Sequence, residues 1–307
     1  MAESLAGPPW TDHLAAVLPH RPLKGVKVVS LALNLPGPAA LARLRSMGAD
    51  CVQVLPPTGD PMAVYSAAAY GDLGRGLRRR TLDLKSPSGQ RRLHALLTSA
   101  QVVLTSFRPA ALQRLGLDAA QLTARFPALS GVAIVGALGS RADAPGHDLT
   151  YQADVGLVPG HDLPPSLLAD MAGALAVSEA VLQVVLLQRQ TGRGAHLTVG
   201  LAESAQWLSW PLHWQLTNPG GLLGGRHAGY RVYACKGGRV ALAALEPHFV
   251  SALGRVLGVP DLTPDACLTP AVHQSVADFM ARRTRRQLQQ IAARHDLPLH
   301  TLPPMPS

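Results

Sequence analysis

Aromatic residues are scarce in this chain of 307 residues, at 4%, and charged residues make up only 15%. Apolar residues reach 47%, so the composition excludes a disordered chain and a coiled coil. With so few aromatic side chains, Ala, Leu and Val must build most of the core. The same shortage leaves little to stack on nucleic-acid bases.

Cysteine is nearly absent, and Cys51, Cys235 and Cys267 lie far apart without a CxxC pair. This pattern predicts a reduced, cytoplasmic protein. The longest apolar stretch, Ala174 to Leu187, is interrupted by polar residues, and the first ten residues lack the pattern of a secretory signal. No membrane-spanning segment is therefore expected.

Acidic residues are outnumbered, with 19 Asp and Glu against 28 Lys and Arg, for a net charge of +9. Such an excess favours nucleic acid, an anionic membrane or a small molecule that carries phosphates. The sequence has no zinc finger and no RNP-like aromatic motif, so no nucleic-acid partner is predicted. A compositional bias toward Arg, spread over a solvated surface, remains an alternative.

Strands and helices alternate through the first half of the chain. Residues 26–31 read as a Val-rich strand, and a helix with Leu41, Leu44 and Met47 on one face follows it. The same alternation recurs in strands at 51–55, 101–105 and 131–137 and helices at 89–100 and 118–125. The pattern predicts an α/β fold with a Rossmann-like, doubly wound parallel sheet. The first strand-to-helix turn is not GxGxxG, so neither a nicotinamide nor a flavin cofactor is predicted.

The alternation stops at a loop over residues 141–166, which leads into a long apolar helix at 168–190. Two strands further on, joined by Lys236-Gly237-Gly238, indicate an antiparallel hairpin and a smaller α+β domain. The predicted boundaries are residues 1–200 for the large domain, 201–275 for the small domain and 276–307 for a helical tail.

Three ionisable residues are candidates for catalysis. His147 lies in a loop beside Asp148, where an imidazole can act as acid or base; a surface histidine is the alternative. Asp170 lies at the start of the long apolar helix, as an N-cap or as a carboxylate beside free N–H groups. Glu246 ends an apolar strand just before Pro247, which holds its backbone extended; it either carries chemistry or marks where the strand reaches the surface.

Candidate phosphate ligands are the run Arg78-Arg79-Arg80, with a solvated loop as the alternative, and Arg108 just after a strand. The helix start at Gly37-Pro38 offers N–H groups to an anion. No His or Cys set has metal-ligand spacing, so no metal is predicted.

These landmarks together resemble the class III CoA-transferase superfamily (CaiB/BaiF), most closely its α-methylacyl-CoA racemase branch. The similarity follows family order over roughly residues 22 to 260. The matching fragments include Pro36-Gly37-Pro38, Asp83-Leu84-Lys85, Phe107-Arg108-Pro109, Gly146-His147-Asp148, Ala169-Asp170, Gly192-Arg193-Gly194 and Glu246-Pro247.

The resemblance implies a large α/β domain, a small domain and an interlinked homodimer that acts on acyl-CoA thioesters without metal or redox cofactor. It places Asp170 at the essential carboxylate: a nucleophile in the transferases, an acid/base opposite His147 in the racemases. Glu246 would orient that histidine. It further implies that CoA is bound by Arg79, Lys85, Arg108 and Asp148.

Three readings follow. The first is a racemase that inverts the α-carbon of a 2-methyl-branched acyl-CoA through an enolate, whose oxygen would meet the N–H groups of Met171–Gly173. The second is a transferase that moves CoA between carboxylic acids through a covalent intermediate on Asp170. The third is a shortened, non-catalytic CoA-binding paralogue. The presence of both His147 and Glu246 favours the racemase, since the transferase needs neither.

Overall fold

The computed structural model describes residues 20–305 and divides the chain into two compact units, one ending at Ser209 and the other beginning at Trp210. The sequence predicted this boundary after residue 200. In the structure, residue 200 is the last residue of strand β6 (His196–Gly200), which continues directly into helix α10 (Leu201–His213). The first half of α10 packs in the first unit, because Ala202 and Ala205 belong to a buried cluster there with Ala137.

The first unit is built on a six-stranded sheet with the strand order β3-β2-β1-β4-β5-β6. Every neighbouring pair is parallel, so the predicted doubly wound α/β architecture is confirmed. Besides β6, the strands are β1 (Lys27–Ser30), β2 (Asp50–Leu55), β3 (Arg78–Thr81), β4 (Val102–Thr105) and β5 (Ser130–Val135).

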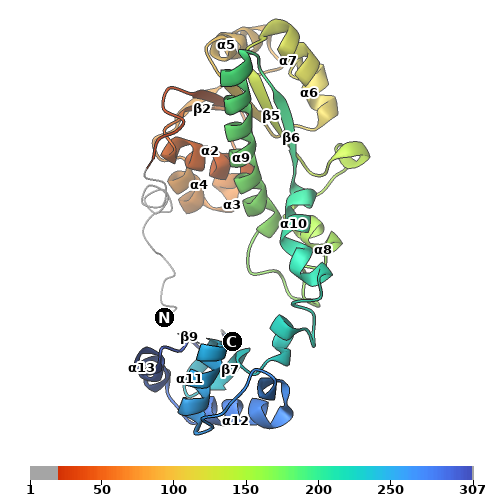
Figure 1. Ribbon diagram of the computed structural model, residues 1–307. Helices are drawn as coiled ribbons and strands as arrows, with labels where there is room; N and C mark the ends of the chain where they lie inside the picture. Colours follow the sequence, from red (N-terminus) through yellow and green to blue (C-terminus); the bar gives the residue numbers. More distant parts are fainter. Residues whose placement is uncertain (1–19, 306–307) are drawn as a thin grey trace. The chain divides into compact units, whose positions relative to one another are not determined.

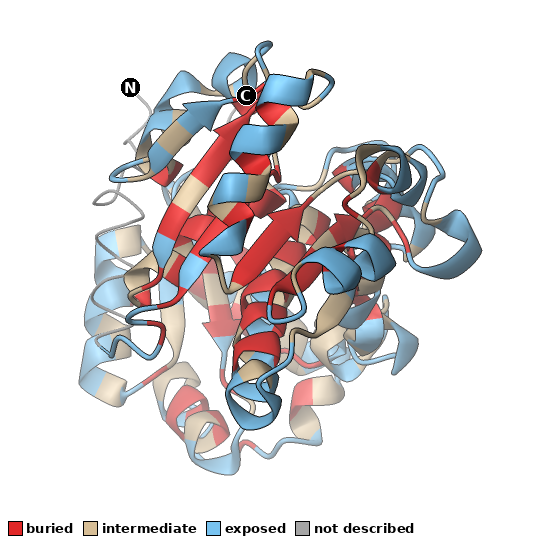
Figure 2. Cartoon of the chain, turned by 90° about the horizontal axis from the view of Figure 1, so that it is seen from above, coloured by how far each residue is buried: buried red, intermediate tan, exposed pale blue. Residues whose placement is uncertain are grey.

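Helices cover both faces of this sheet. Two successive residues of β1, Val28 and Val29, point to opposite faces and pack in different clusters. Val28 packs in the cluster beneath α2 (Pro36–Ser46) and α9 (Leu168–Thr191), which lie side by side along one face (Figure 1). Val29 packs in the cluster on the other face, beneath α5 (Pro87–Thr98), α6 (Pro109–Leu115) and α7 (Ala119–Arg125). Figure 2 shows the buried interior of the strands and the exposed outer faces of the helices. Such two-sided burial explains why the strands are continuous apolar runs.

Helix α9 is the core helix of this unit. With 24 residues, it is long and apolar enough to cross a membrane by length and composition alone. In the structure its Val177, Val181 and Val184 side chains are fully buried against the sheet and α2. Those contacts account for the apolar residues on that face, whereas Leu175 and Leu186 are exposed.

Several short elements were not predicted from the sequence. The Arg78–Arg80 run is an edge strand, β3, rather than a loop, and the segment predicted as a loop over 141–166 contains helix α8 (Asp148–Asp154). Helices α3 (Met62–Tyr65) and α4 (Ala67–Leu73) follow β2, and a 3₁₀ turn spans Gly139–Arg141. These elements have seven residues or fewer, too few to show a periodic apolar pattern.

The second unit has a three-stranded antiparallel sheet in the order β7-β8-β9. The predicted hairpin forms β7 (Tyr230–Cys235) and β8 (Gly238–Ala243), and β9 (Leu299–Leu302) pairs with β8. The helices are α11 (Pro247–Leu257), α12 (Pro270–Ala281) and α13 (Arg285–His295), with short helical turns at Leu222–Arg226 and Ala266–Leu268. The stretch predicted as a tail, 276–307, contributes Val276, Met280 and Leu288 to this unit's core.

The carboxyl ends of the parallel strands meet at one edge of the large sheet. The strand order reverses direction between β1 and β4, and ligands of doubly wound sheets bind outside the carboxyl ends at such a point. Arg108 directly precedes α6 after β4, and the loop that carries His147 follows β5. Arg108 and His147 therefore follow strand ends at this edge, whereas Arg79 lies within β3.

Candidate active site

Helices α8 and α9 pack together and bring His147, Asp148 and Asp170 into one neighbourhood. His147 immediately precedes α8, Asp148 is its first residue, and Asp170 is the third residue of α9. The Asp148 side chain is buried, and its Oδ1 accepts a hydrogen bond from the Asp170 N–H at 2.9 Å. A direct bond thus joins two sequence-predicted site residues that lie far apart along the chain.

The second oxygen of Asp148 is also held. Gln152, one turn along α8 and almost fully buried, donates from Nε2 to Asp148 Oδ2. The same Nε2 lies 3.0 Å from the Ser166 carbonyl, just before α9. The resemblance gave Asp148 a role in CoA binding, which stays a prediction. In the structure its carboxylate fastens α8 to the start of α9.

The backbone of His147 is fixed by its own helix. Its N–H donates to Thr150 Oγ1 at 3.1 Å, and its carbonyl accepts from the N–H groups of Thr150 and Tyr151 at 2.9 and 3.2 Å. None of these bonds uses the imidazole, and the residue is exposed. The exposed ring can therefore meet a ligand while its backbone stays in place.

The carboxyl group of Asp170 is electrostatically unusual. Burial and, second, the nearby negative charge of Asp148 raise its pKa from 3.8 to about 7. A group with a pKa near neutrality can both give and take a proton at physiological pH, as an acid/base catalyst must. Strongly perturbed carboxyl groups of this kind gather at functional sites.

Two expectations for the start of α9 were wrong. Leu167, not Asp170, is the N-cap residue, and no side-chain bond caps the helix from that position. The N–H of Met171 donates to the Leu167 carbonyl at 3.0 Å, so it is already used within the helix and is not free for an enolate oxygen. The acceptor that serves the first turn is Asp148, from another helix.

Several polar contacts that the sequence did not reveal hold the β5–α8 loop, residues 136–147. Glu203 in α10 accepts from the Leu138 N–H at 3.1 Å, and Asp143 accepts from the Ala110 N–H at 3.2 Å. Arg141 and Asp154 form an exposed ion pair at 3.3 Å. The sequence could not predict these contacts, because they join the loop to three different helices at irregular separations along the chain.

One glycine sets how closely α9 approaches α10. A Cβ on Gly173 would overlap the Leu201 side chain, which lies against the helix at that point. Gly173 is one turn beyond Asp170 and is buried. The missing side chain therefore leaves room for the Leu201 side chain beside the start of α9.

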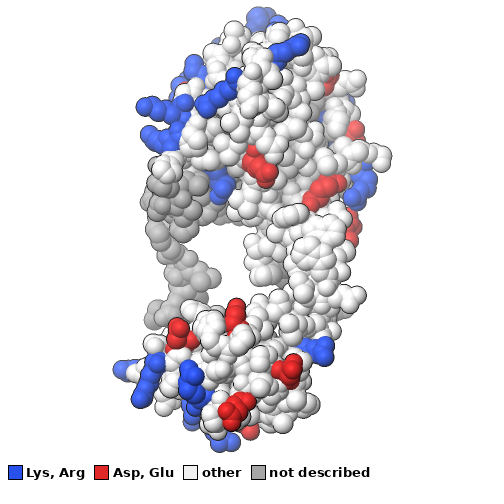
Figure 3. Space-filling model, in the orientation of Figure 1, with Lys and Arg blue, Asp and Glu red and all other residues white. Residues whose placement is uncertain are grey.

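Of the predicted phosphate ligands, Arg108 and Lys85 carry exposed side chains after β4 and β3. Arg108 is near enough to act electrostatically on Tyr151 of α8, so it belongs to the same edge as Asp170. Figure 3 shows Lys and Arg side chains gathered on the surface around β2 and α5, where few acidic side chains appear. Their role in CoA binding stays a prediction.

Arg79, the third predicted phosphate ligand, is engaged with protein groups. Its Nε donates to Oε1 of the fully buried Gln53 at 3.2 Å, and its guanidinium lies 4.1 Å from the centre of the Tyr70 ring. Gln53 in turn donates to Asp60, which accepts from the N–H of Asn34 at 3.0 Å. Arg79 thus helps to hold the loop after β1. A phosphate bound to Arg79 would share its guanidinium group with Gln53.

The start of α2 offers fewer donors than its sequence suggested. Pro36 and Pro38 have no N–H, so Gly37 has the only N–H among the first three residues of the helix. A Cβ on Gly37 would overlap Ala32, so the glycine is required for close packing.

Glu246 belongs to the second unit. It is exposed and directly precedes α11, and its carbonyl accepts from the N–H groups of Phe249 and Val250 at 2.9 Å. Its predicted role beside His147 stays a prediction.

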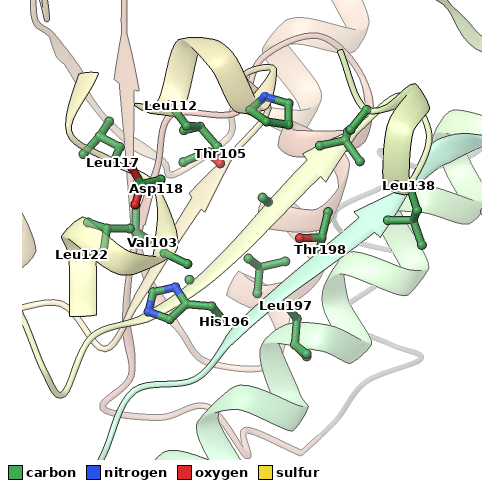
Figure 4. Close-up of a pocket in the computed structure, with 18 residues that line it drawn as sticks. Val103, Thr105, Leu112, Leu117, Asp118, Leu122, Leu138, His196, Leu197 and Thr198 are labelled. Carbon is green, nitrogen blue, oxygen red and sulfur yellow. The ribbon is translucent and has the colours of Figure 1, made fainter. Parts of the chain in front are cut away.

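A cavity of about 330 Å³ lies on the sheet beside β4, β5 and β6 (Figure 4). Its lining is mostly apolar and includes Leu112, Leu138 and Leu197, with His196 at one side. It contains neither His147 nor Asp170. Among residues 20–305, no group of three or more His, Cys, Asp or Glu side chains is placed to hold a metal ion.

Comparison with known proteins identifies the family. The family model for CoA-transferase family III matches residues 23–305. The human alpha-methylacyl-CoA racemase is 29% identical over 88% of this chain and 74% of its own length. The cinnamoyl-CoA:phenyllactate CoA-transferase of Clostridium sporogenes is 31% identical over 60% of this chain and 50% of its own length.

Solved structures agree at the level of fold. The crystal structure of Rv3272, a hypothetical protein from Mycobacterium tuberculosis, superposes with a TM-score of 0.79 at 23% identity, over 91% of this chain and 83% of that one. A CAIB/BAIF family protein from Brucella suis gives a TM-score of 0.75 at 23% identity, over 94% of this chain and 85% of that one. With its parallel sheet, its small antiparallel sheet and its family match over residues 23–305, this chain belongs to CoA-transferase family III (CaiB/BaiF).

Proposed function

We propose that this protein is an acyl-CoA racemase that inverts the α-carbon of a 2-methyl-branched acyl-CoA. A base removes the proton from the α-carbon, and the electron pair moves to the thioester oxygen to give an enolate. An acid on the opposite face then returns a proton. His147 and Asp170 are the two groups, and either serves as base depending on which enantiomer is bound.

The observation that carries this proposal is the pKa of about 7 at Asp170, produced by burial and by Asp148. A carboxyl group with this pKa is well matched to proton transfer at neutral pH. A nucleophile that attacks an acyl-CoA must be ionised, and a raised pKa reduces the ionised fraction. The site therefore favours proton transfer over the transferase chemistry.

The relatives support the same choice. Two alpha-methylacyl-CoA racemases, from human and mouse, match 88% of this chain at 29% and 28% identity, whereas the acetyl-CoA:oxalate CoA-transferase of Acetobacter aceti matches 80% of it at 25% identity. The substrate that the proposal requires is a CoA thioester, with Arg108 and Lys85 as exposed cations for its phosphates. No other cofactor enters the proposed reaction.

The test is deuterium exchange at the α-carbon of a 2-methylacyl-CoA in D₂O, followed by mass spectrometry. Incorporation together with loss of optical purity, without any acceptor acid, supports the racemase. Transfer of CoA to an added carboxylic acid without exchange would establish the transferase instead. An absence of both reactions, with CoA still bound, would leave the non-catalytic CoA-binding protein.

Asp148→Asn is expected to move the pH dependence of the reaction to lower pH. The amide oxygen still accepts from the Asp170 N–H, and Gln152 can turn its side-chain amide so that its unpartnered Oε1 accepts from the new NH2 group. The negative charge that disfavours ionisation of Asp170 is gone, so the Asp170 pKa should fall, while burial, the larger cause, keeps it above 3.8. The measurement is kcat/KM against pH, in which the limb due to Asp170 shifts to lower pH.

Asp154→Asn is the matched control, because this α8 carboxylate is exposed and pairs with Arg141. It should leave the profile in place. An Asp148→Asn profile that coincides with the wild-type profile would show that Asp148 does not tune the site.

We also propose that the protein is a homodimer, in the interlinked arrangement that the family resemblance implies. Three of the chain's four tryptophans lie between residues 207 and 214. Trp207 is 73% exposed and Trp214 63% exposed, in a chain whose aromatic content is only 4%. A sequence cluster of exposed tryptophans is typical of protein interfaces, and a second copy of this chain is the proposed occupant.

Trp207→Ser with Trp214→Ser is therefore expected to weaken dimerisation by about tenfold or more. Analytical ultracentrifugation over a range of concentrations measures the change. Leu163→Ser, at a residue 76% exposed outside this cluster, is the control and should leave dimerisation unchanged. A wild-type protein that stays monomeric at all concentrations would contradict the dimer.

A further inference from the structure

Among the buried members of a cluster at the candidate active site, Tyr151 alone has a large side chain. It is 8% exposed and packs with Ala137, Ala169, Ala202 and Ala205. Ala169 immediately precedes Asp170. The aromatic ring thus fills the space beneath the start of α9, where every other buried member of the cluster is alanine.

The other side of the ring lies against two glycines of the β5–α8 loop. A Cβ on Gly146 would come within 2.6 Å of Tyr151 Cε1 and of its hydroxyl. A Cβ on Gly136 would collide with the hydroxyl and lie 3.2 Å from Cζ. Gly136 begins the loop and Gly146 directly precedes His147, so one ring contacts both ends of the segment that carries the imidazole.

Tyr151 also contacts His147 through the backbone, since its N–H donates to the His147 carbonyl at 3.2 Å. Tyr151 therefore contacts Gly146, directly before His147, through its ring and the carbonyl of His147 itself through its peptide group. The same ring belongs to the cluster that contains the neighbour of Asp170.

The phenol group itself is unsuited to proton transfer at neutral pH. Burial and then the Asp170 carboxylate raise the pKa of Tyr151 above its usual value; Asp154 and Glu203 act in the same direction, and Arg108 opposes them. The hydroxyl stays protonated and uncharged beside these groups. What Tyr151 contributes is its volume.

Resting on the proposed function, we propose that Tyr151 is a positioning residue: its ring, wedged between Gly146 and the Ala169 cluster, sets the separation of His147 and Asp170. The two groups must reach opposite faces of one carbon atom, so the reaction depends on that separation. A displacement of about 1 Å costs on the order of 100-fold in rate.

The test uses a set of four variants. Tyr151→Phe alone keeps the ring and should retain kcat within about threefold of wild type. Gly136→Ala alone pushes against the hydroxyl and should lower kcat by about 100-fold with little change in KM. Gly136→Ala combined with Tyr151→Phe removes the colliding oxygen and should regain most of that loss.

Gly146→Ala is the matched control, because Tyr151 Cε1 lies as close to its new methyl group as the hydroxyl does. Tyr151→Phe keeps Cε1, so it should not rescue Gly146→Ala. Rescue of Gly136→Ala but not of Gly146→Ala is a pattern that general destabilisation would not produce. Equal rescue of both, or rescue of neither, would overturn the proposal.

Melting temperatures of the same variants keep this test separate from the proposed function. The collision at Gly136 should lower the melting temperature, and Tyr151→Phe should restore it, whatever reaction the protein catalyses. If Gly136→Ala does not fold, Tyr151→Leu adds no atom and should lower kcat at least tenfold at near-constant KM. Unchanged kcat in Tyr151→Leu would refute the role of the ring.

Discussion

Asp170→Asn is expected to abolish both racemisation and CoA transfer and, at the same time, to make the protein more stable above neutral pH. The amide cannot exchange a proton at the α-carbon and cannot attack an acyl-CoA, so activity should fall by at least about 1000-fold. The gain in stability has the same cause as the raised pKa of Asp170: burial and the nearby Asp148 charge disfavour the ionised carboxylate in the folded protein.

The direction of the stability change follows from the pKa of Asp170, which rises from 3.8 to about 7 on folding. Well below pH 3.8 the group is protonated in both states, and its burial does not lower the stability of the fold. Between pH 4 and 7 the unfolded chain ionises first, so stability falls with rising pH and then levels off. The pKa difference bounds this loss at about 4 kcal/mol, and partial solvent access makes it smaller.

Differential scanning calorimetry at pH 4 and pH 8 checks this expectation. Asp170→Asn should melt about 5 °C above wild type at pH 8 and close to wild type at pH 4. Asp162→Asn, at an exposed loop carboxylate, is the control and should show no such pH-dependent difference. A variant that is less stable than wild type at pH 8 would show that the Asp170 carboxylate stabilises the fold.

His147→Ala is expected to abolish deuterium exchange at the α-carbon while the protein keeps its fold. The backbone bonds of His147 run to Thr150 and Tyr151 and do not involve the imidazole, so alanine preserves them. Loss of one of the two proton-transfer groups should lower racemisation by at least about 100-fold. Any CoA-transfer activity should be retained, since the transferase chemistry uses Asp170 alone.

The measurement pairs the exchange assay with a CoA-transfer assay on the same protein preparation. His161→Ala is the control, because His161 lies in a second Gly-His-Asp sequence and is also exposed. It should leave exchange intact. Undiminished racemisation in His147→Ala would remove this histidine from the mechanism.

The sequence predicted the architecture of the large unit because its strands are apolar on both faces. Such runs as Val102–Thr105 stand out from their surroundings, and the amphipathic helices between them are long enough to show a period. Edge strand β3 and helix α8 were missed, because an exposed Arg-rich strand and a helix of seven residues carry neither signal. Strand β9 was missed because it lies in a Pro-rich segment.

For the site, the sequence identified residue types but not their contacts. His147 and Asp170 were found from local context, yet the bond between Asp148 and the Asp170 N–H joins residues 22 positions apart. The roles of Tyr151 and Glu203 depend on where the β5–α8 loop folds, which no local pattern encodes. Arg79 was predicted as a phosphate ligand from its run of three arginines and from the family resemblance. Its hydrogen bond to Gln53 joins two strands of the sheet, and the sequence did not reveal it.

The contact between the Leu201 side chain and α9 at Gly173 has a consequence for the evolution of this chain. A methyl group at that position would overlap Leu201 Cδ2 and force this side chain into another rotamer, one turn from Asp170. The packing beside the carboxylate can therefore be altered from a residue that touches no substrate. In related chains, a larger residue at this position and a smaller side chain at position 201 would be expected to occur together.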